Sequence, residues 1–175
     1  MVTEQLRGLR QLSIKASDEV RRAIFALTGP GQDGADLTDR LRLPLAELQR
    51  SSGIHAHLFV TGTPSPGVAV IQDVVSLVVN EAVTNARKHA DARTVLVSLS
   101  HEPDRLDLVV QDDGVGAPEV LLRTFQDSQL HFGLRHIRQL VIDSCGSFEV
   151  ANGEEAGLVV RVSLPLKPGE AGCGS

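Results

Sequence analysis

Aromatic residues are scarce in this sequence of 175 residues. It has no tryptophan and no tyrosine, and its five phenylalanines bring the aromatic share to only 3%. Unpaired bases stack on aromatic side chains, so binding of single-stranded nucleic acid is not expected. Positive charge is also in deficit, because 17 basic side chains face 22 acidic ones and give a formal net charge of −5. Polyanions bind basic surfaces, which argues against nucleic acid and acidic membranes as partners of this chain.

Cysteines and long apolar runs are few as well. Cys145 and Cys173 have no further ligand at the spacing of a zinc site, so free thiols in a reducing cytoplasm are expected. The longest apolar stretch, residues 68–79, is interrupted by Gln72 and Asp73 and falls short of the roughly 18 residues of a membrane span. The first residues show no export signal. We expect a cytoplasmic chain without membrane contact, although a longer parent protein could carry an anchor.

The residues that are present predict a globular α+β domain. Hydrophobic residues make up 42% of the chain and charged residues 22%, which is ordinary for a soluble protein with a core. Helices packed on the predicted strands give a two-layer α/β sandwich with a mixed, mostly antiparallel sheet, preceded by a helical segment. Periodicity predicts helices over 4–27, 36–50, 70–90 and 132–144, strands over 54–61, 93–100, 105–111, 147–151 and 158–164, and a glycine- and proline-rich break at 28–34.

The segment 80–90 is the most informative part of the predicted helices. At about 3.6 residues per turn, the side chains of Glu81, Asn85, Lys88 and His89 fall on one side and small apolar residues on the other. A carboxylate, an amide oxygen and a cation on successive turns suit a metal-bound water, Mg²⁺ and phosphate oxygens. On spacing alone, an ordinary solvated helix face explains the same pattern.

Two further segments carry glycines beside polar residues. In the first, Asp112 follows a strand and precedes Gly114 and Gly116. Such an aspartate suits the exocyclic amine of adenine, and the glycines permit close approach of a ligand, although the same run is also a common turn. In the second, Gly133 lies at the mouth of a helix, where free backbone N–H groups bind anions. An ordinary loop before a helix is the alternative there.

The order and spacing of these segments resemble the ATPase superfamily of gyrases, chaperones, histidine kinases and mismatch-repair proteins. Residues 80–90 resemble its N box, residues 112–116 its G1 box and residues 131–134 its G2 box. Residues 157–166 resemble its closing strand, so the resemblance covers about 54–166. Within the superfamily, the runs around Asn85 and Gly133 look like those of the nitrate-sensor-like sensor histidine kinases.

The resemblance implies roles for individual residues, with ATP and Mg²⁺ as cofactors. Glu81 matches the acidic catalytic residue that activates a water or polarises the phosphate acceptor. Residues 117–130 match the ATP lid. The implied nucleotide-binding residues are Asn85, which also ligates Mg²⁺, Asp112, which binds the adenine amine, Gly114 and Gly116, which let the backbone approach the nucleotide, Lys88 and His89 near the phosphates, and Gly133 and Leu134 on the lid side.

The resemblance also divides the chain. It implies a remnant of the dimerisation and phosphotransfer helix at 1–28, a linker and helix at 29–53, the ATP-binding catalytic domain at 54–166 and a tail at 167–175. The acceptor histidine of the family lies on a helix before the catalytic domain, whereas the first histidine here is His55, in a predicted strand. We therefore expect the acceptor outside this chain.

The implied function is that of the ATP-binding catalytic domain of a two-component sensor histidine kinase in signal transduction. It would transfer the γ-phosphoryl group of ATP to a histidine outside this chain. The implied partners are a response regulator, an acceptor-histidine helix or sensor region of the same or another chain, and a second copy in a homodimer. Two alternatives remain open: an anti-sigma-factor kinase that phosphorylates serine, and a non-catalytic regulatory module that binds ATP.

Overall fold

The computed structural model describes residues 36–64, 69–119, 122 and 132–166. The chain divides into two units, Met1–Gly34 and Ala35–Ser175, and all the described residues belong to the second. The helix predicted over 4–27, the break at 28–34, most of the predicted lid and the tail at 167–175 lie outside the described residues.

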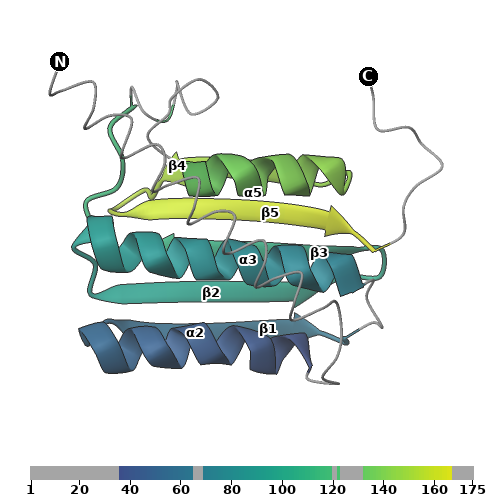
Figure 1. Cartoon of the computed structure of the whole chain (residues 1–175), viewed down its shortest axis with the longest axis horizontal. Helices are drawn as coiled ribbons and strands as arrows, with labels where there is room; N and C mark the ends of the chain where they lie inside the picture. The colour runs from purple at the N-terminus through teal and green to yellow at the C-terminus, as the bar shows by residue number, and fades with distance from the viewer. Residues whose placement is uncertain (1–35, 65–68, 120–121, 123–131, 167–175) are drawn as a thin grey trace, which may run out of the picture. The chain divides into compact units, whose positions relative to one another are not determined.

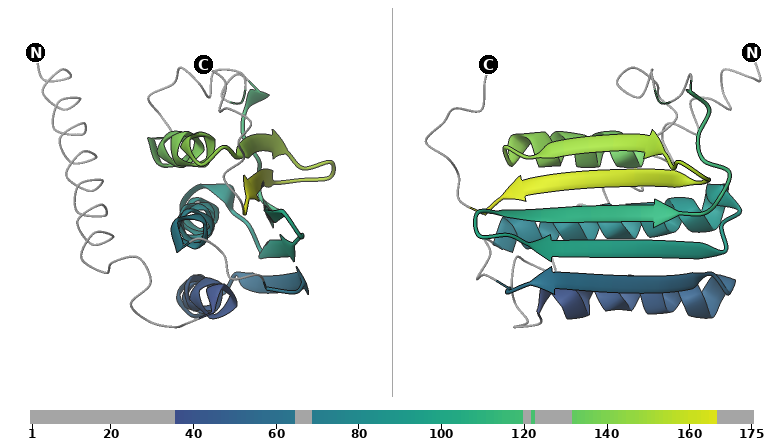
Figure 2. Two further views of the ribbon diagram at one scale, coloured as in Figure 1. Left: turned by 90° about the vertical axis from the view of Figure 1, so that its right-hand side faces the viewer. Right: turned by 180° about the vertical axis from the view of Figure 1, so that it is seen from behind.

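The described residues form two layers (Figure 1). One layer is a sheet of five strands in the order β1-β2-β3-β5-β4, in which β1 and β2 are parallel and the other neighbours are antiparallel. The left view of Figure 2 shows the helices side by side on one face of this sheet. The predicted fold class is thereby confirmed. The elements are α2 (Leu37–Ser52), β1 (His55–Gly62), α3 (Ala69–Asn85), a π-helical turn (Ala86–Ala90), β2 (Thr94–His101), β3 (Arg105–Asp112), α5 (Phe132–Asp143), β4 (Ser147–Asn152) and β5 (Leu158–Pro165).

Helix α2 belongs to the core of this domain. Four of its leucines recur every three or four residues along one side of the helix. These four are buried in one cluster with residues of α3 and the strands. The guanidinium of Arg40 donates to the buried carboxylate of Asp73 on α3 at 2.6 Å. An apolar stripe and one ion pair therefore attach α2 to α3. The buried leucines are Leu37, Leu41, Leu45 and Leu48.

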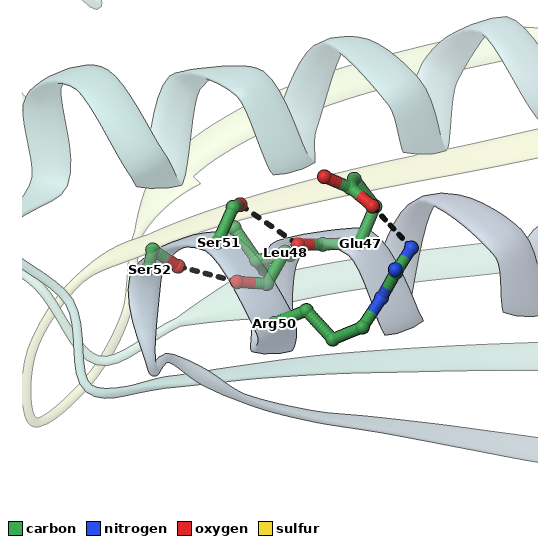
Figure 3. Close-up of polar contacts among 5 residues, drawn as sticks. All are labelled: Glu47, Leu48, Arg50, Ser51 and Ser52. Atoms are coloured by element: carbon green, nitrogen blue, oxygen red, sulfur yellow. Dashed lines mark hydrogen bonds and ion pairs between the residues drawn. The ribbon is translucent and has the colours of Figure 1, made fainter.

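The end of α2 is fixed by local hydrogen bonds (Figure 3). The hydroxyls of Ser51 and Ser52 donate to the carbonyls of Glu47 and Leu48 at 2.7 and 2.6 Å, and Arg50 pairs with the Glu47 carboxylate. Gly53 then takes a left-handed conformation, and its N–H donates to the carbonyl of Gln49 at 3.1 Å. The chain is thus turned directly into β1.

The sequence pattern predicts one regular helix that continues to Ala90, but the structure differs. Helix α3 ends at Asn85, and Ala86–Ala90 form a wider π-helical turn. The carbonyl of Ala90 accepts from the backbone N–H of Val115 at 2.8 Å, so the loop after β3 holds the end of this turn. Turns of this kind often occur at functional sites.

Strand β1 is less buried than its alternating sequence predicts. Ile54, just before it, is buried, and Ala56 and Leu58 are half-buried, but Val60 is 37% exposed. The difference arises because β1 is an edge strand, with a neighbour on one side only. Among the helices of the described residues, none has the length and apolarity to cross a membrane.

Candidate functional site

One pocket lies between the end of α3, the end of β3, the start of α5 and the hairpin of β4 and β5. Polar side chains from Asn85, His89 and Asp112 meet apolar ones from Leu134 and Leu158. Asn85, Asp112, Leu134 and Leu158 also line its inner continuation between the helices and the sheet. The full lining consists of Asn85, His89, Ala90, Asp112, Gly116, Ala117, Leu122, Leu134, Val150 and Leu158.

Two separate elements bring the central polar groups together. Asn85 is the last residue of α3, and its side chain makes no capping hydrogen bond to the π-helical turn that follows. Asp112 is the last residue of β3, in the middle strand of the sheet. A helix end and a strand end thus direct an amide and a carboxylate into one pocket.

The Asp112 carboxylate is held by the backbone through one of its oxygens. Oδ1 accepts from the N–H of Gly114 at 2.9 Å and from the N–H of Leu158 at 3.3 Å. Within the described part of the chain no donor reaches Oδ2, so that oxygen is available to a ligand. Burial raises the pKa of Asp112, and the two backbone hydrogen bonds oppose that rise. The site therefore holds an acceptor whose charge is only partly compensated by the protein.

The neighbouring Asp113 has a different task. Its Oδ1 accepts from the N–H groups of Arg93 and Thr94 at 2.7 and 2.8 Å, at the start of β2. The hydrogen bond from the Thr94 backbone is the main reason that the pKa of Asp113 is lowered. Asp113 is exposed and ties two strand ends together, whereas Asp112 faces the pocket.

Gly114 is required by packing against the helix end. A Cβ at this position would lie 2.1 Å from the carbonyl oxygen of Ala90 and 2.7 Å from its Cβ. The loop after β3 therefore approaches the π-helical turn more closely than any side chain permits. Gly114 does not line the pocket in the described structure, and its predicted approach to the nucleotide stays a prediction.

Glu81 and Gly133 meet at the first turn of α5. A Cβ on Gly133 would lie 1.9 Å from Oε1 of Glu81, so the missing side chain makes room for this carboxylate. Glu81 is half-buried on α3, outside the lining of the pocket. The partial positive charge of a helix N-terminus stabilises a carboxylate placed there. The structure thus joins the predicted catalytic residue to a glycine from another motif.

Lys88 and His89, which are predicted to lie near the phosphates, are on the π-helical turn together with Arg87. Arg87, Lys88 and His89 are all exposed, and of these only His89 lines the pocket. Of the residues predicted for the site, the structure gathers Asn85, His89, Asp112, Gly116 and Leu134 in the pocket lining and leaves Glu81, Lys88, Gly114 and Gly133 outside it.

The sequence pattern did not single out several pocket residues. Val150 and Leu158 are on β4 and β5, and Ala117 and Leu122 follow the glycine turn. The alternation of apolar residues predicts the strands, but it does not say which apolar residue reaches the end of the sheet beside Asp112. These residues give the pocket apolar walls that suit a planar heterocycle.

Comparison with known proteins places these features in a family. Residues 71–168 match the family model described as histidine kinase-, DNA gyrase B-, and HSP90-like ATPase. The chain is 24% identical over 155 residues to the sensor histidine kinase LnrJ of Bacillus subtilis, covering 89% of this chain and 36% of that protein. It is 30% identical over 160 residues to the histidine-protein kinase/phosphatase UhpB of Salmonella typhimurium, covering 91% of this chain and 30% of that protein. The chain therefore spans about a third of the length of these relatives.

A solved structure shows the same fold. The ATP-binding domain of PrrB from Mycobacterium tuberculosis superposes with a TM-score of 0.57 at 24% identity, covering 76% of this chain and 96% of that one. At this identity the similarity concerns the fold alone.

Proposed function

Because this chain belongs to the family of histidine kinase-, DNA gyrase B- and HSP90-like ATPases, we propose that its pocket binds ATP with Mg²⁺ for transfer of the γ-phosphoryl group to a histidine. The domain serves as the catalytic part of a sensor histidine kinase, and its acceptor lies on a separate helix. The convergence of Asn85 and Asp112 on one pocket with apolar walls carries this proposal. Placement among the nitrate-sensor-like kinases stays a prediction.

Asp112 selects adenine at the inner end of the pocket. The two backbone bonds to Oδ1 fix the carboxylate, and Oδ2 accepts from the exocyclic amine of the base. Leu134, Val150 and Leu158 supply apolar contacts to the ring. Guanine presents a carbonyl oxygen where adenine has its amine, and that oxygen would face a carboxylate. The pocket therefore favours ATP over GTP.

Asn85 holds Mg²⁺ at the phosphate end. Its amide oxygen is a hard ligand of the kind that Mg²⁺ prefers, and it is not used for capping. In the described residues no group of three His, Cys, Asp or Glu side chains is placed to hold a metal alone. Asn85 would therefore supply one oxygen ligand, and Mg²⁺ in sites of this kind commonly keeps several waters and binds nucleotide phosphates. When bound, Mg²⁺ would neutralise charge on the phosphates, and His89, which lines the pocket from the π-helical turn, would lie near them.

Glu81 acts on the acceptor. Its carboxylate accepts a hydrogen bond from one ring nitrogen of the acceptor histidine, which makes the other nitrogen a better nucleophile. That nitrogen attacks the γ-phosphorus, the bond to the bridging oxygen breaks and ADP leaves, while the proton of the other ring nitrogen passes to the Glu81 carboxylate. A response regulator then receives the phosphoryl group, and the reaction belongs to the cytoplasm, where both partners occur.

Calorimetric titration tests the nucleotide site. The parent chain should bind ATP more tightly with Mg²⁺ than with EDTA, and GTP more weakly than ATP. Asn85→Ala should abolish the gain from Mg²⁺ while leaving the affinity measured in EDTA within about twofold, because only the metal ligand is removed. Absence of ATP binding at millimolar nucleotide would refute the site.

Phosphotransfer is tested separately with an acceptor-histidine helix pair and a response regulator supplied in trans. Label from radioactive ATP that is acid-labile and base-stable identifies phosphohistidine. ATP binding without any transfer would instead favour the regulatory module.

A further inference from the structure

Asn152, the last residue of β4, holds both backbone groups of one pocket residue. Its Oδ1 accepts from the N–H of Ala117 at 2.8 Å, and its Nδ2 donates to the carbonyl of Ala117 at 2.9 Å. Ala117 lines the pocket and directly follows the glycine turn. A side-chain amide with one donor and one acceptor thus pairs with this residue as a neighbouring strand would.

The preceding residue fits the same amide. Gly116 has φ +68°, and a Cβ on it would lie 2.7 Å from Oδ1 of Asn152. Gly116 also lines the pocket. The glycine therefore lets the loop pass over the Asn152 side chain in a left-handed conformation that other residues rarely adopt.

The end of the hairpin of β4 and β5 contacts both ends of the loop 112–117. Asn152 is the register partner of Leu158. Leu158 donates its N–H to Oδ1 of Asp112 at one end of the loop, and Asn152 holds Ala117 at the other. The residue pair Asn152 and Leu158 thus contacts both the Asp112 carboxylate and Ala117 in the pocket wall.

We propose that Asn152 is a positioning residue of the nucleotide pocket, which fixes Ala117 so that the loop from Asp112 keeps the shape that admits the base. It does not touch the nucleotide itself. The inference rests on the proposed function for the identity of the ligand. The two hydrogen bonds between the Asn152 side chain and the Ala117 backbone, which we call the Asn152 clamp, exist without nucleotide.

The clamp requires a donor and an acceptor together, and this requirement supplies its test. Alanine offers neither group and leaves Ala117 to water, since Asn152 is exposed. An ionised aspartate offers no donor and directs a negative oxygen at the Ala117 carbonyl.

Hydrogen exchange tests the clamp without nucleotide. In Asn152→Ala the amide of Ala117 should exchange at least about tenfold faster than in the parent, because its acceptor is gone. Ser147→Ala, at the far end of β4, is the matched control and should leave that amide unchanged. Unchanged exchange of amides in β2 and β3 shows that the variants remain folded. If Ala117 exchanges equally fast in parent and Asn152→Ala, the clamp is refuted.

ATP affinity tests the positioning role. At about pH 8 we expect Kd to rise about three- to tenfold in Asn152→Ala and further in Asn152→Asp. Equal affinity of parent and both variants, despite faster exchange at Ala117, would overturn the proposal. If the parent does not bind ATP, the proposed function fails, and exchange at Ala117 still decides the clamp.

Discussion

Asp112 and Asp113 show how two adjacent, chemically identical side chains acquire opposite properties. Asp112 is half-buried at the pocket, and burial raises its pKa. Asp113 is exposed, and backbone hydrogen bonds, first that from Thr94, lower its pKa. Asp112, the proposed adenine acceptor, therefore costs stability when charged, whereas Asp113, which ties two strand ends together, stabilises the fold when charged.

The substitution Asp112→Asn isolates the ligand-facing oxygen. The amide oxygen can still accept from Gly114 and Leu158, while the new NH₂ group takes the place of Oδ2 and faces the amine of adenine, donor to donor. We expect ATP affinity to fall roughly 10- to 100-fold, the scale of one lost hydrogen bond to a charged group. Calorimetry measures the affinity. Asp113→Asn is the matched control and should leave it within about twofold, because Asp113 does not line the pocket.

The opposite pKa shifts of Asp112 and Asp113 predict opposite effects of the two carboxylates on the stability of the fold. The folded pKa of Asp112 is raised, so its carboxylate destabilises the fold above that pKa, and the cost disappears as the pH falls toward the unfolded pKa. The folded pKa of Asp113 is lowered, so its contribution is present above the unfolded pKa and is lost as the pH falls through the folded pKa. At neutral pH, Asp112→Asn should therefore melt no lower than the parent. A clearly lower melting temperature for Asp112→Asn would contradict this assignment.

At the scale of elements, the sequence predicted features that follow from a periodic pattern of residues. It did not predict features that depend on contacts between segments far apart in the sequence. The period of about 3.6 residues predicted a polar side for residues 80–90, and Lys88 and His89, on the π-helical turn that follows α3, are exposed as predicted. The wider turn at Ala86–Ala90 has no periodic signature, because the contact with Gly114 and Val115 holds it. Likewise, no local pattern brings Asn152 to Ala117, since strand order alone makes them neighbours.

The contact between α3 and α5 suggests a way to move the carboxylate of Glu81, the proposed catalytic residue, without replacing it. In Gly133→Ala the new Cβ occupies the position of Oε1 of Glu81, so that carboxylate must rotate away. Gly133 does not line the pocket, so ATP affinity should stay within about threefold. Phosphotransfer to the separate acceptor should fall at least about tenfold, and by no more than the factor of about 10² to 10⁴ that a general acid or base contributes.

A double-mutant cycle separates this effect from general damage to α5. In a Glu81→Gln background, which retains the shape of the side chain but not its charge, Gly133→Ala should reduce transfer little further, because the affected group is already disabled. Rates are compared at saturating ATP. Equal loss from Gly133→Ala in both backgrounds would show that the glycine does not act through Glu81.

At the scale of the molecule, α2 decides where the domain begins. A domain that starts at Ile54, as the family resemblance implies, would omit the buried leucines of α2 and expose the core of α3. Burial of one leucine contributes about 1.5 to 3 kcal/mol, and a whole domain is stable by only about 5 to 15 kcal/mol. We therefore place the start of the folded unit before Leu37, which agrees with the division after Gly34.

Two deletions test this boundary. Removal of residues 1–34 should leave the melting temperature within a few degrees and ATP affinity unchanged, because all pocket residues and α2 remain. Removal of residues 1–53 should leave no cooperative melting transition, since all the buried α2 leucines are lost together. The apolar stripe predicted over 4–27 is too extensive to remain in water, so self-association seen for the parent in sedimentation should disappear with the shorter deletion. Loss of the ATPase fold on removal of residues 1–34 would instead make that segment part of the domain core.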